Sequence, residues 1–128
     1  MSYNNRYPIE GTVALDDGEV WDVKVAEAGS FMERFMGLMG KREVPALSGL
    51  LFRKCTSIHM FFMRVPLDIV WLGEVDGETG RYPVIAVDRG LLPWRLVVGP
   101  RGTRHVAEFA AGTFPAGCDP MSLGVEGA

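Results

Sequence analysis

The sequence has few of the residues that build metal centres and disulfide frameworks. Its 128 residues include two cysteines and two histidines. Because Cys55 and Cys118 are far apart in the sequence, spacing alone leaves open whether they are free or bridged. No pair of closely spaced cysteines marks a zinc site. We therefore predict no cofactor and no metal centre, with Cys55 and His59 as weak candidates for metal ligands.

Excess basic charge and long apolar runs are also missing. The 13 lysines and arginines face 16 acidic residues, a net charge of −3, which argues against a nucleic-acid-binding surface. The densest apolar run, residues 58–72, is too short to span a membrane and contains His59, Arg64, Pro66 and Asp68. The first ten residues lack the basic and apolar segments of a signal peptide, so we expect a cytoplasmic location.

The residues that are present indicate one small, mainly β domain. Sixteen glycines and eight prolines indicate many turns, and the length suits a single domain. We expect residues 1–10 to form an N-terminal arm and residues 11–128 to form the domain. Hydrophobic alternation predicts strands at residues 11–15, 21–26, 49–52, 58–63, 67–72, 81–88, 105–110 and 121–125. Ser30 and Glu33 form a capping-box pattern for a helix at residues 31–39. The pattern predicts an antiparallel sandwich or small barrel.

Asp68 is the most informative polar residue, because it lies within an apolar strand. A buried carboxylate needs hydrogen-bond donors. Arg42 and Arg64 could pair with it, and backbone amides of a turn could do the same. The structural interpretation is a buried aspartate that fixes a turn, and the alternative is a binding or catalytic carboxylate.

His59 could approach Asp68 if the two strands meet at the Pro66 corner. Such a pair is the minimum for a general base. Cys55 would add a nucleophile. In a continuous strand, however, four residues place Cys55 about 13 Å from His59. A cysteine nucleophile would therefore require a bend between them, at residues 56–57.

Arginines surround Trp94 in a glycine-rich loop, and they are Arg89, Arg95, Arg101 and Arg104. One interpretation is a solvated loop. The functional interpretation is an anion-recognising rim, in which guanidinium groups and an aromatic face capture a carboxylate, phosphate or sugar. The sequence has no phosphate-binding glycine fingerprint, Walker motif or nucleophile-elbow serine that would identify the ligand.

Several short motifs in a fixed order resemble one known family. They are Gly37-Leu38-Met39 with Arg42, residues 49–52, residues 59–68, Pro93-Trp94, residues 108–112 and Gly124. The set is similar to the domain of unknown function 192 family over residues 21–125, in a variant branch with Cys55 and His59. The resemblance implies a compact, jelly-roll-like β domain with one or two short helices. It implies no activity.

These observations lead us to expect a non-catalytic β module that binds a small anionic ligand or a protein partner. The expected rim consists of residues 41–43, 55–59 and 89–95. The candidate binding residues are Arg42, His59, Arg64, Asp68, Trp94 and Arg95. Two alternatives stay open. One is a hydrolase or isomerase that uses His59 and Asp68 as catalytic residues, and the other is an assembly accessory without a small-molecule site. The oligomeric state is not predicted.

Overall fold

The computed structural model of the chain describes residues 7, 9–27, 47–59, 66–92 and 96–126. These residues form nine strands and contain no helix, hence none that could cross a membrane. The strands are β1 (Ile9–Leu15), β2 (Val20–Glu27), β3 (Ser48–Phe52), β4 (Ser57–His59), β5 (Leu67–Leu72), β6 (Tyr82–Leu91), β7 (Leu96–Val98), β8 (His105–Ala110) and β9 (Pro120–Val125). The helix predicted at residues 31–39 lies outside the described residues.

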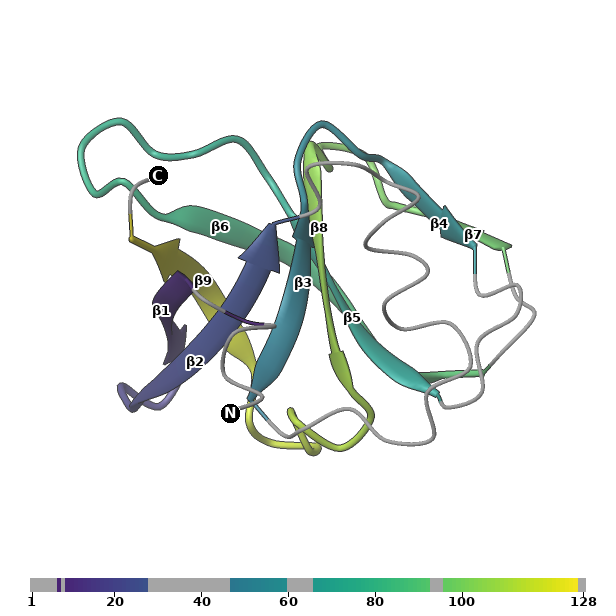
Figure 1. The fold of residues 1–128 in the computed structure, drawn as a ribbon, viewed down its shortest axis with the longest axis horizontal. Coiled ribbons are helices and arrows are strands. Elements are labelled where there is room, and N and C mark those ends of the chain that lie inside the picture. The colour runs from purple at the N-terminus through teal and green to yellow at the C-terminus, as the bar shows by residue number, and fades with distance from the viewer. Residues whose placement is uncertain (1–6, 8, 28–46, 60–65, 93–95, 127–128) are drawn as a thin grey trace.

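Seven strands close into a barrel in the order β1-β2-β3-β8-β5-β6-β9 (Figure 1). The mainly β fold and the small barrel predicted from the sequence are therefore present. The jelly-roll-like alternative of two packed sheets is not the arrangement of the described strands. The barrel is closed because β9 pairs with β1 as well as with β6.

The prediction of a purely antiparallel sheet was wrong at one pair of strands. β2 and β3 run parallel, with Lys24 opposite Ser48 and Glu27 opposite Leu51. Parallel neighbours need a crossover connection, because a tight turn reverses the chain direction. Residues 28–47 link the two strands along the chain. The sequence has no repeated alternation of strands and helices, which is the pattern that would have predicted parallel neighbours.

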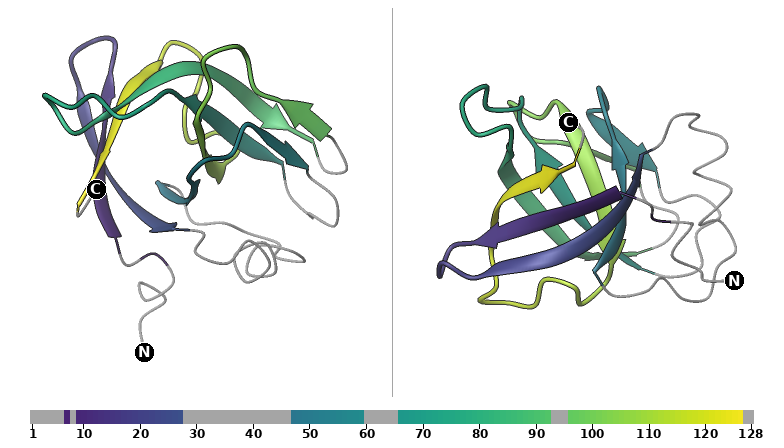
Figure 2. Two further views of the ribbon diagram at one scale, coloured as in Figure 1. Left: turned by 90° about the horizontal axis from the view of Figure 1, so that it is seen from above. Right: turned by 60° about the vertical axis from the view of Figure 1, so that its left-hand side comes forward.

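β4 and β7 form a separate two-stranded sheet, which we call the ribbon. It lies on the side of the molecule opposite β1, β2 and β9 (Figure 2). The strand predicted at residues 58–63 is described as far as His59, and it pairs with β7. Residues 60–63 lie outside the described residues. The ribbon packs on the barrel through Ile58, which is buried, and Val97.

Buried side chains form two cores, one inside the barrel and one on its outer face. Alternate residues of a strand point to opposite faces, so β3, β5 and β8 contribute to both cores. The interior core comprises Val13, Leu15, Val23, Val25, Leu51, Val70, Leu72, Tyr82, Ala107, Phe109, Phe114 and Leu123. The outer core comprises Tyr7, Ala26, Leu50, Phe52, Ile58, Leu67, Ile69, Trp71 and Val106. Each large apolar side chain buried in this way contributes about 2 kcal/mol.

Candidate functional site

Asp68 holds one end of the barrel together through backbone hydrogen bonds. Its carboxylate is buried, with 1% of the residue exposed. Oδ1 accepts the Gly90 N–H at 2.8 Å, and Oδ2 accepts the N–H groups of Gly112 and Phe114 at 3.1 Å. The side chain therefore fixes the end of β6 and the turn after β8 to β5. Both carboxylate oxygens are engaged in this structural role.

Of the predicted binding residues, Asp68 is the one whose side chain the structure describes. His59 is the last residue of β4, which belongs to the ribbon, whereas Asp68 belongs to the barrel. The side chain of His59 lies outside the described part of the structure. The remaining candidates also lie outside it, and they are Arg42, Arg64, Trp94 and Arg95.

Cys55 occupies the loop between β3 and β4 and is not part of a strand. Its N–H donates to the Arg104 carbonyl at 3.0 Å, and its Sγ donates to the Ser57 carbonyl at 2.9 Å. Cys55 and Cys118 are both free thiols. Among the described residues, no group of three histidine, cysteine or acidic side chains is arranged to hold a metal ion.

His105 connects the loops at the opposite end of the barrel. Its Nδ1 accepts the Lys54 N–H at 2.9 Å, so the ring proton is on Nε2, which donates to Glu74 Oε1 at 3.1 Å. This bond lowers the pKa of the Glu74 carboxyl. The contact with His105 also holds Lys54, whose φ of 55° is unusual for a residue with a side chain. Both ring nitrogens of His105 are occupied by these bonds.

Arg53 adds a second polar connection beside His105. Its guanidinium donates to the Tyr82 hydroxyl and lies over the Tyr82 ring, 5.5 Å from the ring centroid. Its Nε is 2.7 Å from Glu27 Oε1, an ion pair rather than an aligned hydrogen bond. The Tyr82 ring also contacts the edge of His105, at 5.1 Å between ring centroids. These contacts hold Arg53 at this end of the barrel, which we call the barrel mouth.

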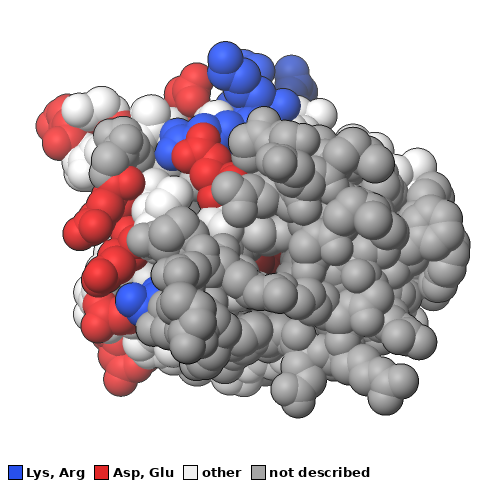
Figure 3. Space-filling model, in the orientation of Figure 1, with Lys and Arg blue, Asp and Glu red and all other residues white. Residues whose placement is uncertain are grey.

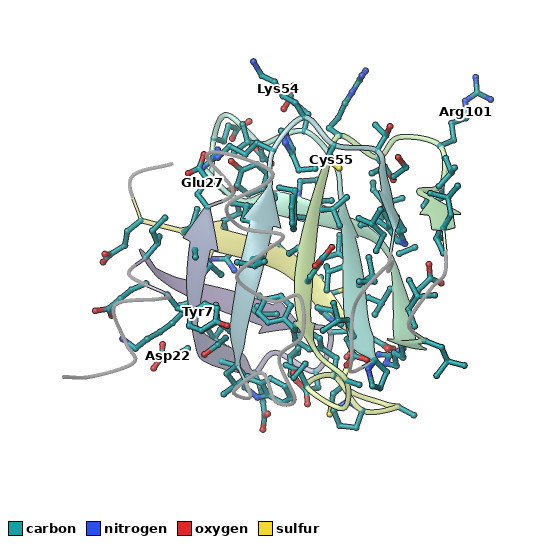
Figure 4. All side chains as sticks on the ribbon, turned by 45° about the vertical axis from the view of Figure 1, so that its right-hand side comes forward. Tyr7, Asp22, Glu27, Lys54, Cys55 and Arg101 are labelled. Carbon is teal, nitrogen blue, oxygen red and sulfur yellow. The ribbon has the colours of Figure 1, made fainter. Side chains whose placement is uncertain are left out.

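Three exposed cations gather at this mouth, and we call Lys54, Arg101 and Arg104 the basic end. The Cys55–Arg104 backbone bond places Lys54 next to Arg104, and the turn at residues 100–103 presents Arg101. Figure 4 shows Lys54 and Arg101 projecting outward at the same end of the molecule. Figure 3 also shows blue side chains at this end, with acidic side chains beside them and along the side formed by β1 and β2.

The arginine cluster predicted around Trp94 is divided between the two ends of the barrel. Arg89 donates to the Phe114 carbonyl and to Asp119 Oδ1 at 2.7 Å. This places it beside the turn that Asp68 fixes. The length of β5 and β8, roughly 17 Å, separates that turn from Arg104. An anion bound beside Arg104 would therefore be too far from Arg89 to contact it.

The ribbon next to the basic end exposes apolar side chains. Leu96 is 65% exposed and Val98 is 71% exposed, whereas Val97 between them points to the outer core. The Gly99 N–H donates to the Thr56 carbonyl at 2.7 Å, which joins the end of β7 to the loop before β4. Leu96 and Val98 therefore form a small exposed apolar area on the ribbon.

Glu108 is a buried carboxyl group with no compensating partner among the described residues. It lies in the middle of β8, opposite Leu50 of β3 and Ile69 of β5, and 7% of it is exposed. Burial raises the pKa of this carboxyl to about 8. Buried ionisable groups that lack a partner are candidates for functional residues.

A shallow hollow of about 320 Å³ lies on the outer face of β1 and β9. Arg81 lies across it and donates to Thr12 Oγ1 and Ser122 Oγ, both at 2.8 Å, and to the carbonyls of both residues. A side chain at Gly124 would collide with the guanidinium. Arg81 therefore acts as a brace across the seam where the barrel closes.

Sequence reasoning missed Glu108 and the Glu74–His105 pair as features of interest. The signal for Glu108 was available, because a single acidic residue interrupts the apolar strand at residues 105–110. The signal for Glu74 was absent. Its loop is mostly polar, and nothing in the sequence distinguishes Glu74 from the other acidic residues of this loop.

The chain belongs to the DUF192 family (Uncharacterized ACR), whose model matches residues 12–117. Within this family it is similar to the UPF0127 protein TK1120 of Thermococcus kodakarensis, with 31% identity over 105 residues. The match covers 74% of this chain and 59% of that protein, so the chain spans about three fifths of the length of this relative.

Two solved structures share the fold. One is a Sinorhizobium meliloti 1021 protein described as a "putative transcription regulator", with a TM-score of 0.77, 22% identity, and coverage of 95% of this chain and 97% of that one. The other is a protein of unknown function from Novosphingobium aromaticivorans DSM 12444, with a TM-score of 0.72, 22% identity, and coverage of 92% and 84%. At this identity the likeness shows the fold alone.

Proposed function

We propose that this chain is a non-catalytic binding domain that docks an acidic protein partner on the basic end and the adjoining ribbon. The observation that carries the proposal is the combination of three exposed cations and two exposed apolar side chains on one continuous surface. Cations attract an acidic partner and steer its approach. Leu96 and Val98 provide the apolar contact that stabilises the docked state.

The continuity of this surface follows from the backbone. The loop that carries Lys54 leads into β4, and the loop that carries Arg101 and Arg104 leads out of β7. The Gly99–Thr56 and Cys55–Arg104 backbone bonds join the two loops. A partner that binds along β7 would therefore also contact the cations, which lie at one end of this binding surface.

Two of the described acid–base groups, Asp68 and His105, support binding over catalysis. Asp68 uses both carboxylate oxygens on backbone amides, and His105 uses both ring nitrogens. A general base needs a free lone pair within reach of a substrate. The enzyme alternative would therefore have to rest on His59 without Asp68 as a free carboxylate.

The test is the affinity for a short fluorescent peptide of alternating glutamate and leucine, measured by anisotropy. Two comparison peptides replace glutamate with lysine or leucine with serine. We expect the glutamate–leucine peptide to bind most tightly, and to bind about tenfold more weakly when salt rises from about 50 to about 300 mM.

Variants assign the binding to the proposed surface. K54E/R104E and L96S/V98S should each weaken binding about tenfold or more. K24E is the matched control, because Lys24 is an exposed cation on β2, away from this surface. Equal affinity of all three peptides, or equal losses in K24E and K54E/R104E, would refute the proposal. If citrate or phosphate inhibited peptide binding at a concentration equal to that of the peptide, we would conclude that the ligand of this surface is a small anion and not a protein partner.

A further inference from the structure

His105 has a fixed position in the barrel, and one edge of its ring meets a loop. It is the first residue of β8 and pairs with Leu72 of β5, so the barrel backbone fixes its position. The side chain is 9% exposed, and its ring packs edge-on against the ring of Tyr82. The Nε2–H bond to Glu74 sets the orientation of the ring. Rotation of the ring would therefore break both contacts.

The other ring nitrogen makes a hydrogen bond that requires a neutral imidazole. Nδ1 accepts the Lys54 N–H at 2.9 Å. A backbone N–H is always a donor, so Nδ1 carries no proton in this arrangement. In the imidazolium form both ring nitrogens carry protons. A proton on Nδ1 would place two donors opposite each other, and the hydrogen bond would become a repulsive contact.

Lys54 is the part of this contact that can move. It lies in the turn after β3 and not in a strand. Its φ of 55° is in the left-handed region, which costs free energy for a residue with a Cβ atom. The bond to His105 offsets this cost, because it satisfies the Lys54 N–H in this conformation. When the bond is lost, relaxation of the turn relieves the strain, whereas His105 stays in the barrel wall.

Charged and titratable residues surround the ring from the turn after β3, the loop after β5, β6 and the residue before β8. They are Arg53, Lys54, Glu74, Tyr82 and Arg104. Glu74 favours a positive ring, because its carboxylate accepts the Nε2–H, and the three cations oppose it. Glu27 forms an ion pair with Arg53, which weakens the effect of that cation. An added proton therefore has a charge partner at Nε2 and a conflict with the backbone at Nδ1.

We propose that His105 is a pH-sensitive switch of the docking surface, in which the neutral ring holds Lys54 at the basic end and the protonated ring releases it. The inference rests on the proposed function, because Lys54 is one of the three cations of that surface. Imidazole gains its second proton between about pH 8 and about pH 5. The imidazolium does not replace Lys54 on the surface, since its side chain is 9% exposed and bonded to Glu74. An acidic partner is thus bound at neutral pH and bound more weakly at acidic pH.

The first experiment observes the switch without any partner, by NMR of the ¹⁵N-labelled whole chain. The chain has two histidines, and H105N identifies the ring signals of His105. The ¹⁵N shifts of the ring nitrogens report which of them carries a proton. Near pH 8 we expect a proton on Nε2 alone. When the second proton binds at lower pH, the protection of the Lys54 amide from hydrogen exchange should fall about tenfold, as loss of one hydrogen bond predicts.

The second experiment measures the affinity for the glutamate–leucine peptide at constant ionic strength. Between about pH 7.5 and about pH 5.5 the affinity of the wild type should fall about threefold, because one cation leaves the surface. H105N should bind equally at both pH values, because the asparagine Oδ1 can accept the Lys54 N–H and does not titrate. E74Q should move the midpoint of the change to lower pH, since the imidazolium loses its carboxylate partner. E78Q, an exposed carboxylate of the same loop, is the matched control and should not move it.

The outcomes separate the switch from the docking function. A Lys54 amide that stays protected after His105 is protonated overturns the switch and leaves the docking function standing, and so does a ring that stays neutral down to about pH 5. An equal loss of affinity in wild type and H105N also overturns it. If H105N does not fold, equal midpoints in E74Q and E78Q overturn it instead. A wild type that does not bind the peptide at about pH 7.5 refutes the docking function and, with it, its regulation by His105.

Discussion

At the scale of single residues, Asp68 illustrates how a buried charge can organise backbone. The sequence identified it as unusual because it interrupts an apolar strand, and it offered arginines or turn amides as partners. The carboxylate accepts three N–H groups from two segments that lie 22 to 46 residues away. Such distant partners have no signature in the local sequence.

Replacing Asp68 by asparagine should destabilise the fold by about 3 kcal/mol. The amide nitrogen is a donor and would face the donors of Gly112 and Phe114, and the charge that strengthens the remaining bonds is lost. Urea denaturation would measure the change. D22N is the control, because Asp22 is exposed on β2. A D68N midpoint equal to that of D22N would contradict the structural role.

At the scale of elements, the period-two pattern predicted most described strands to within two or three residues. β5 and β8 match their predicted ranges because apolar residues there are bounded by clear turn signals. The pattern could not give the neighbours of each strand. The parallel β2–β3 pair and the separate ribbon depend on contacts between distant segments, which strand periodicity does not encode.

The candidate sites were less predictable than the strands, for a physical reason. The basic end combines Lys54 with Arg101 and Arg104, which are about fifty residues apart in the sequence. Arg89, which is nearer to Arg101 in sequence, lies at the other end because β6 carries it there. A site assembled by strand order is visible in the sequence only when the strand order is known.

The close approach of β3 and β8 depends on Gly49. A Cβ at this position would lie 2.6 Å from the Glu108 carbonyl oxygen and 2.7 Å from Phe109 Cε1. We therefore expect G49A to cost about 3 kcal/mol, since neither a strand carbonyl nor a buried ring can move aside cheaply. Thermal and urea unfolding would measure this loss.

G77A is the matched control for G49A. No atom lies within 4 Å of the Cβ position at Gly77, so its effect should stay below about 0.5 kcal/mol. If the two alanine variants unfold alike, the spacing between β3 and β8 is looser than the structure indicates.

At the scale of the whole molecule, Glu108 should make stability depend on pH. Its carboxyl has a pKa of about 8 in the folded chain, against 4.5 for the unfolded group. The contribution of this residue is greatest when both states are protonated, below about pH 4.5. It is lost as pH rises to about 8, at roughly 1 kcal/mol per pH unit, because only the unfolded chain ionises in this interval.

The comparison of wild type with E108Q isolates this dependence from other titrating groups. The stability of E108Q relative to wild type should increase between about pH 5 and about pH 8, and should then become constant. Urea unfolding at several pH values measures the difference. A constant difference over this range would show that the Glu108 carboxyl is ionised in the folded chain.

The seam between β1 and β9 also has a consequence for the order of events during synthesis. β1 pairs with β2 early in the chain, but its other edge is covered by Pro120–Val125. While the ribosome is still adding residues, that edge has no strand to pair with and could recruit a strand from another nascent chain. Barrel closure therefore awaits the last strand, and a slow, chaperone-sensitive final step is the expected kinetic signature of this fold.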